Sequence, residues 1–461
     1  MTAAPSVTSQ APSRPAKARH PVGRPPVLPL LGALVDLRRD TLGTLARNAR
    51  EHGDLVRFHV LGRGIWQLNH PELVHDAVFR QGKHLDKGYG YRVLRGLMGE
   101  GLITASHPVN RRQRPLVAPA LTRKVVPRWT AQIRSFVDAW IDGALGRTLD
   151  VQASMLDLAR SITVGVVLGS ESERHVAAAR AVELIVTHAI PEIWGLGRFL
   201  PDAVPTPSRR ALARALADFD RAVADTLAER RARPPRDADV LDAMLAARDA
   251  DGRPMDDRAL RDEIATLFLA GHETTSRTLT QALVLGRTHP ESWRALVEEV
   301  DRVLGGRDPT WPDLRKLERV RAHALETMRL RPPVWMVTRS ATAPMQVGGH
   351  PVQPGEELFV PIYLIHHDPR WFDAPDAFRP ARWLDGLEAR LPRHAFMPFG
   401  PPPRRCIGDQ LGMMVLQITL ARIAQRCRLA LKAPEPPLDP GLVLRFAGPA
   451  RLAFAPRSAA A

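Results

Sequence analysis

One long helical pattern constrains the fold of this chain more than any other feature. Residues 256–290 read DDRALRDEIATLFLAGHETTSRTLTQALVLGRTHP. Apolar and small residues recur there at helical spacing: Leu260, Ile264, Leu267, Phe268, Gly271, Thr275, Leu279, Ala282 and Leu283. About 30 residues at 1.5 Å each form a rod of roughly 45 Å, and Asp256 or Asp257 can cap its start. We therefore expect a central helix that crosses the whole molecule.

The segments around this helix are mostly helical, with small sheets before and after them. Helical periodicity dominates from about residue 112 to 304. Before it, LVRFHVLGRGIWQLN alternates on both sides of a Gly-Arg-Gly turn, which predicts a hairpin. Beyond Arg331, MQVGGHPVQPGEELFVP contains extended runs that flank Gly-Gly and Pro-Gly turns. We expect one mainly α domain with small β-sheets over residues 28–461, after a flexible tail over residues 1–27.

The composition indicates in which cellular compartment this protein is found. Hydrophobic residues make up 44% of the chain and charged residues 25%, which is typical of globular proteins. The two cysteines, Cys406 and Cys427, lie in no paired Cys/His zinc pattern and cannot build a disulfide framework. The apolar runs ITVGVVLG and IATLFLAG are shorter than the roughly 20 residues that span a bilayer. We expect a cytoplasmic protein without a transmembrane anchor.

The net charge of +16 admits several kinds of acidic partner. The arginines that supply it are spread over amphipathic segments, and the chain has only three tyrosines. A surface that stacks nucleic-acid bases needs aromatic side chains among its cations. The pattern therefore disfavours nucleic acid and is typical of solvated helix faces.

Midway along the central pattern, AGHETT brings polar groups into a buried segment. Gly271 removes side-chain bulk, while Glu273 and Thr274 are costly in a core unless they are hydrogen-bonded. The segment either bends the helix as a packing feature or carries chemistry. A zinc-protease site is excluded, because the second histidine that His272 would require is replaced by Ser276.

Two further motifs carry charge. In ALETMRLRPP, Glu326 and Arg329 are three residues apart on a helix that ends before a proline, and such a pair is usually exposed. In FMPFGPPPRRCIGDQLGMM, Cys406 follows two arginines and precedes a helical pattern. It is either a small buried hydrophobe or a thiolate ready to bind a metal, since cations and a helix start both favour the anion. Cys427 is expected in the core.

Together, in this order, these segments resemble the cytochrome P450 family of heme-thiolate monooxygenases, from about residue 28 to the end. The resemblance implies a large helical part with a long central helix over heme b and a smaller β-containing N-terminal part. By that resemblance Cys406 is the axial iron ligand, Phe399 packs beneath it, Gly408 completes the loop and Arg404 pairs with a heme propionate.

The remaining motifs match the family residue by residue. Glu273 and Thr274 take the proton-delivery positions. Glu326 and Arg329 match a buried Glu-Arg-Arg cluster completed by Arg382 of FRPARW, which replaces the surface interpretation. Arg114 and Arg339 resemble further propionate-binding cations. The sequence departs from the family pattern at three positions: Asn110, Pro402 and Val415.

The resemblance implies that one oxygen atom from O2 is inserted into a hydrophobic small molecule, such as a terpenoid, fatty acid or polyketide. Because no dinucleotide-binding fingerprint is present, electrons are expected from a separate ferredoxin or flavodoxin and its NAD(P)H reductase. A basic face around Arg404, Arg405, Arg422 and Arg426 is expected to attract that donor to a monomeric enzyme.

The expected walls of the substrate pocket come from three segments and are Tyr89, Tyr91, Phe268, Ala270, Trp335, Met336 and Val337. Two other interpretations stay open from the sequence. One is a peroxide-driven heme-thiolate enzyme, which needs no electron donor. The other is a non-catalytic protein that binds heme or, through its arginines, nucleic acid.

Overall fold

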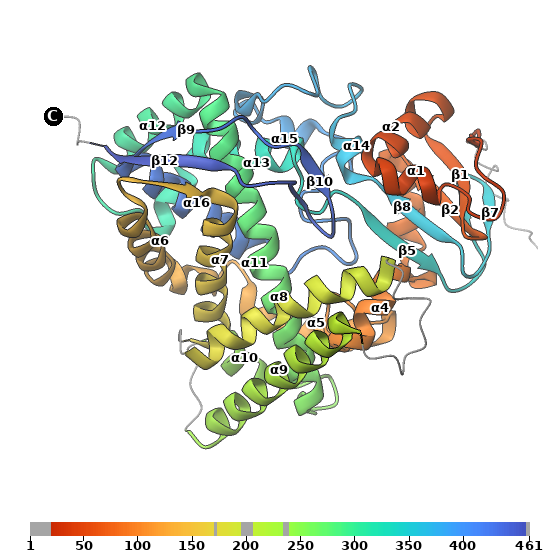
Figure 1. Ribbon diagram of the computed structural model, residues 1–461, viewed down its shortest axis with the longest axis horizontal. Coiled ribbons are helices and arrows are strands. Elements are labelled where there is room, and N and C mark those ends of the chain that lie inside the picture. The colour runs from red at the N-terminus through yellow and green to blue at the C-terminus, as the bar shows by residue number, and fades with distance from the viewer. Residues whose placement is uncertain (1–19, 170–172, 195–205, 234–238, 458–461) are drawn as a thin grey trace, which may run out of the picture.

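The computed structural model describes residues 20–169, 173–194, 206–233 and 239–457. It has a β-rich end, where strands near the N-terminus meet strands from the second half of the chain, and a larger helical part (Figure 1). The predicted mainly α fold with small sheets is confirmed.

The central helix is α11, Asp257–Thr288. It begins where the sequence predicts, because the Asp256 side chain accepts a hydrogen bond from the amide of Ala259 at 2.7 Å. The helix continues through the AGHETT segment without interruption. A Cβ at Gly271 would lie 2.8 Å from Cγ2 of Thr163, so this glycine lets α7, Val151–Leu168, pack closely against α11.

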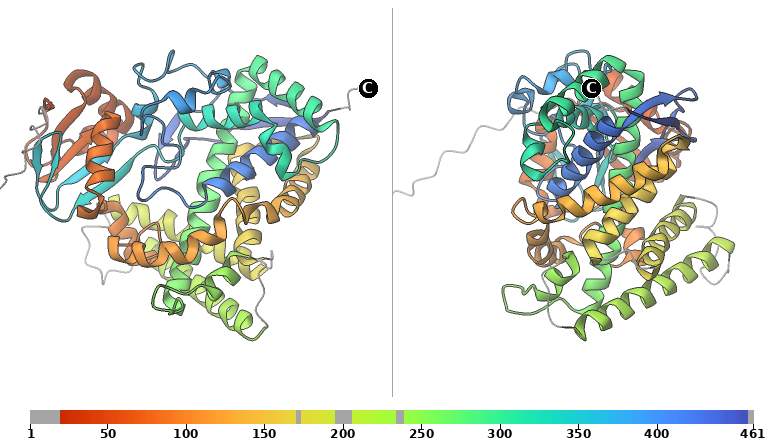
Figure 2. Two further views of the ribbon diagram at one scale, coloured as in Figure 1. Left: turned by 180° about the vertical axis from the view of Figure 1, so that it is seen from behind. Right: turned by 90° about the vertical axis from the view of Figure 1, so that its left-hand side faces the viewer.

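The other helices surround α11, and α16 packs against it in the views of Figure 2. Their bounds are α1 Leu34–Arg39, α2 Thr41–His52, α3 Pro71–Val74, α4 Tyr89–Met98, α5 His107–Val117, α6 Thr130–Ala144, α8 Glu173–Trp194, α9 Pro207–Arg231, α10 Val240–Ala246, α12 Pro290–Leu304, α13 Glu318–Leu330, α14 Ile362–His366, α15 Leu387–Arg390 and α16 Asp409–Arg426.

A five-stranded sheet forms the β-rich end, in the order β1-β2-β8-β5-β3. The predicted N-terminal hairpin is β1, Leu55–Val60, and β2, Arg63–Leu68, paired antiparallel. Strand β8, Glu357–Val360, runs parallel to β2 and antiparallel to β5, Val337–Ala341, which in turn pairs with β3, Leu85–Lys87. This sheet therefore joins segments nearly 300 residues apart and brings β3 and β5 to the edge of the helical part.

Three smaller sheets complete the fold. The predicted extended runs after Arg331 form the hairpin of β6, Met345–Val347, and β7, His350–Val352. Strand β12, Arg451–Pro456, lies between β4, Arg147–Asp150, and β9, Cys427–Leu431, and β10, Leu438–Pro440, pairs with β11, Leu444–Phe446. Cys427 is buried as expected, and it begins β9 directly after α16.

Part of the expected tail is folded. Residues 1–19 lie outside the described residues, but His20 donates its amide to the Gly348 carbonyl at 2.9 Å. Gly23 donates to the carbonyl of Leu55 and accepts from the amide of Arg57, both at 2.9 Å. These bonds extend the edge of β1, so the expected flexible segment does not reach residue 27.

In the described part of the chain, α7 is the one helix whose length and apolar composition would allow it to cross a membrane. In this structure 61% of that helix is buried inside the protein against its neighbours.

Candidate active site

A cavity of about 310 Å³ lies between the central helix and the loop that carries Cys406. Helices α5, α7 and α11, strands β3 and β5 and the loop before α16 all contribute to its walls. The fold thus brings the AGHETT segment and the cysteine loop to one enclosed space, as the sequence predicts.

The cysteine loop is held by its own backbone. The amide of Cys406 donates to the carbonyl of Phe399 at 2.9 Å, and the amide of Gly408 donates to the Cys406 sulfur at 3.3 Å. Gly408 is also the cap of α16, which starts at Asp409. Pro402, where the family pattern has glycine, leaves these bonds in place. The sulfur therefore lines the cavity with an amide donor directed at it.

The charge near this thiol differs from the expectation. Burial raises the pKa of Cys406, against the lowering effects of the Gly408 amide and of Arg114 and Arg405. The guanidinium of Arg404 donates to the carbonyl of Ala105 at 2.6 Å. Binding a metal at this sulfur therefore requires that its proton be released.

Four cations line the same cavity. Arg114, Arg339 and Arg404 are the three that the sequence predicts, from α5, β5 and the cysteine loop. The fourth, Lys87 at the end of β3, was missed by sequence reasoning. Its neighbour Asp86 supplies a carboxylate beside this group, with Oδ1 3.4 Å from Nη2 of Arg404.

These cations repel one another in a buried site. Burial and the charges of Arg339 and Arg404 lower the pKa of Lys87 well below its usual range. Burial and the charges of Arg339, Arg95 and Arg114 lower the pKa of Arg404 to about 10. Such a group is stabilised by an anion with two or more carboxylates that reaches this end of the cavity.

The α11 wall carries the predicted acid and hydroxyl. Thr274 Oγ1 donates to the Ala270 carbonyl at 2.7 Å, and both residues line the cavity. Glu273 also lines it, and its carboxylate lies 3.1 Å from Nη2 of Arg277, one turn farther along the helix. The acid is therefore held in an ion pair beside a hydroxyl that faces the cavity.

Residues 22–454 match the family model for cytochrome P450. The chain belongs to the cytochrome P450 family. It is 32% identical to the cyclooctatin synthase of Streptomyces melanosporofaciens over 95% of this chain and 96% of that protein. It is also 32% identical to the cyclooctat-9-en-7-ol 5-monooxygenase of the same organism, over 91% of this chain and 93% of that protein. The identity to the pentalenene oxygenase of Streptomyces avermitilis is 30%, over 93% and 95% of the two chains.

As a cytochrome P450, the protein is a monooxygenase that uses O2, heme b and a hydrophobic substrate. The residues of the cavity fit this cofactor. Heme b has one iron, which a sulfur can bind, and two propionates, which the four cations that line the cavity can neutralise. Thr274 and Ala270 form the wall beside the heme space; Thr274 contributes a hydroxyl, and the small side chain of Ala270 leaves room.

The Glu-Arg-Arg cluster of the P450 motif is buried. Glu326 accepts from Nε and Nη2 of Arg329, both at 2.9 Å, and from Nε of Arg382 at 3.0 Å. Trp383 Nε1 donates to the same carboxylate at 2.8 Å. Arg329 also donates to the carbonyls of His366, Pro375 and Ala377. The pair is thus an interior anchor between α13 and the segment that precedes the cysteine loop.

Only three of the seven expected pocket residues line the P450 cavity: Tyr91, Ala270 and Val337. The prediction for Phe268 is wrong, because its side chain lies in the core on the other side of α11. The prediction for Tyr89 is wrong too, since its ring is exposed beneath the guanidinium of Arg63. Trp335 and Met336 turn to a second core, where the Trp335 indole donates to the Gly441 carbonyl at 3.0 Å.

Sequence reasoning also missed one whole wall. Helix α7 contributes Ala159, Ile162, Thr163, Val166 and Val167. The only available signal was the apolar run ITVGVVLG, which indicates burial but not the surface that it faces. Of the departures from the family pattern, Asn110 and Val415 line the cavity, whereas Pro402 is part of the cysteine loop and does not line it.

The expected basic face is wrong in most of its members. Arg404 is buried, Arg422 pairs with Asp138 at 2.7 Å, and Arg426 pairs with Asp142 at 2.6 Å. Arg405 is the exception, since about half of its side chain is exposed although it pairs with Asp409. Neighbouring carboxylates therefore neutralise much of the charge that the sequence assigned to this face.

Proposed function

We propose that this cytochrome P450 oxidises a cyclic terpenoid hydrocarbon or alcohol. The observation that carries the proposal is the cavity that brings Cys406, four cations and Thr274 together beside apolar walls. The names of the relatives support the substrate class, because they specify pentalenene and cyclooctat-9-en-7-ol. A mostly apolar cavity suits a rigid ring system with few polar groups.

Each residue around the cofactor has a proposed role. Cys406 binds the iron as a thiolate, and the Gly408 amide stabilises its negative charge. Arg114, Arg339, Arg404 and Lys87 bind the propionates. Bound heme supplies the iron at which O2 is activated for insertion into a C–H or C=C bond.

Two residues of α11 transfer protons to the cavity in this proposal. The Thr274 hydroxyl donates to the Ala270 carbonyl and can switch this donor to a group in the cavity. Glu273 is held by Arg277 at 3.1 Å, so the carboxyl must leave this ion pair to take up a proton and pass it towards Thr274. This arrangement keeps the acid ready without leaving it uncompensated in the cavity.

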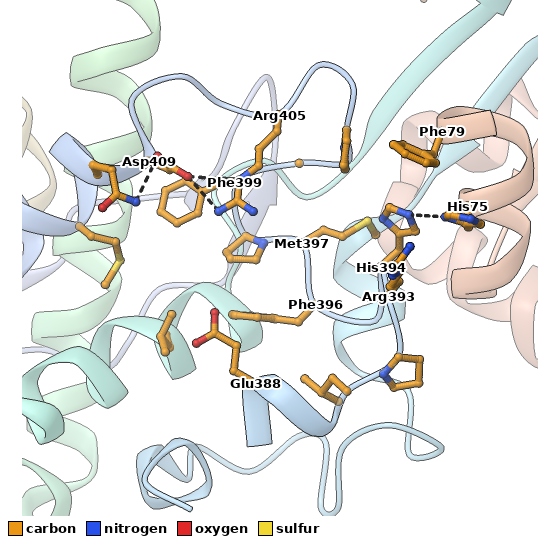
Figure 3. A pocket seen from close by; sticks show the side chains of 18 of the residues that line it. His75, Phe79, Glu388, Arg393, His394, Phe396, Met397, Phe399, Arg405 and Asp409 are labelled. Atoms are coloured by element: carbon orange, nitrogen blue, oxygen red, sulfur yellow. Dashed lines mark hydrogen bonds and ion pairs between the residues drawn. The ribbon is translucent and has the colours of Figure 1, made fainter. Parts of the chain in front are cut away.

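Electrons come, in our proposal, from a separate ferredoxin or flavodoxin that approaches the outer side of the cysteine loop. A hollow of about 600 Å³ lies there, and Phe399 and Arg405 line both this hollow and the cavity (Figure 3). Arg321 and Arg393 also line it. An acidic donor in the hollow would therefore contact the same loop that lines the cavity.

The absorption spectrum of the reduced, carbon monoxide-bound protein tests the cofactor assignment. Thiolate ligation moves the main heme band far to the red of its position with histidine ligation, and Cys406→Ser should abolish the shifted band. Incubation with pentalenene and with cyclooctat-9-en-7-ol under ¹⁸O2 tests the substrate class. We expect one labelled oxygen atom in the product of at least one compound; absence of any product from both would contradict the terpenoid assignment.

The donor site can be tested separately with charge reversals. Arg393→Glu should slow reduction by ferredoxin and its reductase while leaving chemical reduction by dithionite unchanged. Arg221 of α9 is exposed and far along the chain from the hollow, so Arg221→Glu is the matched control. Equal rates in both variants would remove the hollow as the donor site. We also propose that the enzyme is monomeric and that it works in the cytoplasm. Its two unpaired cysteines support a reducing compartment.

A further inference from the structure

A short segment between α4 and α5 forms the roof of the substrate cavity. Residues 99–104 have neither helix nor strand structure, yet three of the six, Gly101, Leu102 and Thr104, are buried and the other three are partly buried. Within this roof segment, Leu102 and Ile103 line the cavity. A segment without secondary structure of its own depends on its partners to keep one position.

Two neighbouring carboxylates on α11 bind the backbone of this roof segment. Asp262 accepts from the amide of Glu100 at 2.7 Å, and Glu263 accepts from the amide of Leu102 at 3.1 Å. Gln113 of α5 braces them: with its amide nitrogen directed inward, it donates to Glu263 Oε1 at 3.0 Å and to the Glu100 carbonyl at 2.8 Å.

The fit between the roof segment and α11 is close. A Cβ on Gly99 would lie 2.0 Å from Oδ1 of Asp262, and a Cβ on Gly101 would lie 2.2 Å from Oγ1 of Thr266. Gly99 also has φ of +76°, in the region that favours glycine. Both glycines are therefore needed for the backbone to reach the carboxylates.

Glu263 is an unusual member of this group because it is fully buried and has no ion-pair partner among the described residues. Asp262, by contrast, pairs with Arg261 at 3.1 Å. Burial raises the pKa of Glu263 to about 8, so the group is largely uncharged near neutral pH. Its contribution is thus hydrogen bonding to the roof and to Gln113 rather than charge pairing.

Glu263 is also too far from the chemistry to act directly. It precedes Thr274 by 11 residues, which corresponds to about 16 Å along a helix. Any effect on the reaction must pass through the residues that it holds, above all Leu102.

We propose that Glu263 is a positioning residue that fixes Leu102 over the cavity and thereby controls how bulky ligands bind next to the heme. The inference rests on the proposed function, because it takes this cavity as the substrate site. It predicts that loss of the Glu263 contacts weakens binding of ligands that reach the roof and spares ligands that do not.

Two ligands of different size test this directly on the heme-loaded protein. Imidazole and 4-phenylimidazole both bind heme iron and shift its absorption band, but only the second extends towards the roof. Glu263→Leu should weaken 4-phenylimidazole about tenfold and imidazole less than twofold. Glu263→Gln keeps an acceptor for the Leu102 amide and should restore most of the selectivity.

Glu299 offers a matched control. It is a buried carboxylate that accepts from the amides of Arg319 and Val320, at 2.8 and 3.2 Å, between α12 and α13 and away from the cavity. Glu299→Leu should leave the ratio of the two affinities unchanged. If Glu263→Leu does not fold, Gln113→Leu removes the brace alone and should shift the ratio in the same direction.

An unchanged ratio in Glu263→Leu, or in Gln113→Leu if that variant decides, would overturn the inference, as would an equal change in Glu299→Leu. The carbon monoxide spectrum separates this outcome from failure of the proposed function. Absence of the thiolate-type band in the unaltered protein refutes the cofactor site, whereas a normal band with an unchanged ratio refutes only the role of Glu263.

Discussion

Glu326 and Arg329 form a two-pronged ion pair in the interior, with both nitrogen–oxygen distances at 2.9 Å and no exposed surface on either side chain. Nε of Arg382, the indole of Trp383 and the backbone amide of Arg379 also donate to the carboxylate. Every strong donor in this cluster has an acceptor, so the cluster is stable only as a unit.

Replacing Glu326 with Gln should therefore destabilise the protein strongly. The change leaves the guanidinium of Arg329 buried without its counter-charge, which typically costs about 3–5 kcal/mol in the free energy of unfolding. Urea denaturation followed by circular dichroism measures the loss.

The control has the same spacing on an exposed helix face. Asp218 and Arg221 are also three residues apart, at 3.3 Å, and both side chains are largely exposed. Asp218→Asn should change the free energy of unfolding by less than about 1 kcal/mol. Similar decreases in the free energy of unfolding in Glu326→Gln and Asp218→Asn would show that the buried cluster contributes no more to stability than an exposed pair.

The sequence predicted the elements of this fold better than the direction in which their residues point. Period and capping predict α11 because Asp256 and the apolar pattern are local signals. Phe268 and Ala270 are two residues apart, about 200° around the helix, and of the two only Ala270 lines the cavity. The packing of α7 decides which one, and no local pattern contains that information.

The site shows the same division. The motif around Cys406 predicts the loop and its contact with α11, because its cysteine, glycines and helix start are adjacent in sequence. Lys87 has no such motif. It reaches the cavity because β3 pairs with β5, with Lys87 directly opposite Arg339, and that pairing joins residues about 250 positions apart. The role of Lys87 can therefore be inferred only after the pairing of β3 with β5 is known.

Lys87 should help to retain heme. Lys87→Met removes one of the four cations of the cavity while keeping a long apolar side chain. Because a hydrogen bond to a charged group contributes about 1.5–3 kcal/mol, heme should dissociate roughly tenfold faster or more. Transfer of heme to apomyoglobin, followed by absorbance, measures the rate. Lys83→Met changes an exposed lysine nearby, and equal rates in the two variants would contradict a role for Lys87.

Thr274 should govern how efficiently reducing equivalents form product. Thr274→Val removes the hydroxyl that faces the cavity, and positioned proton transfer contributes about 10²–10⁴-fold in enzymes. We expect product per NAD(P)H to fall roughly tenfold or more, with a matching rise in hydrogen peroxide. Thr280 makes the same bond to its own preceding turn, at 2.8 Å to Ser276, away from the cavity. Thr280→Val should keep the native yield, and a native yield in Thr274→Val would refute its proton role.

His366 should make the protein sensitive to acid. Its ring is fully buried and accepts from the amide of Met397 at 2.8 Å, and burial, with the charges of His367 and Arg329, lowers its pKa to about 3. In the unfolded chain the pKa returns to about 6.5, so between these values the unfolded state binds a proton that the folded state does not. The stabilisation is complete above pH 6.5 and is lost as the pH falls towards 3, by about 1.4 kcal/mol per pH unit. Buried His323 and partly buried His367, each with a pKa lowered to about 4, add slopes of the same sign.

His366→Gln keeps an acceptor for the Met397 amide but cannot take up this proton. The free energy of unfolding, measured in urea from pH 7.5 to 5, should therefore fall less steeply in this variant. The difference in slope should approach that of one proton, about 1.4 kcal/mol per pH unit. The half-buried His52 at the end of α2 serves as the control, and His52→Gln should retain the native slope. A native slope in His366→Gln would mean that His366 can take up its proton without unfolding, against its burial between Met397 and Arg329.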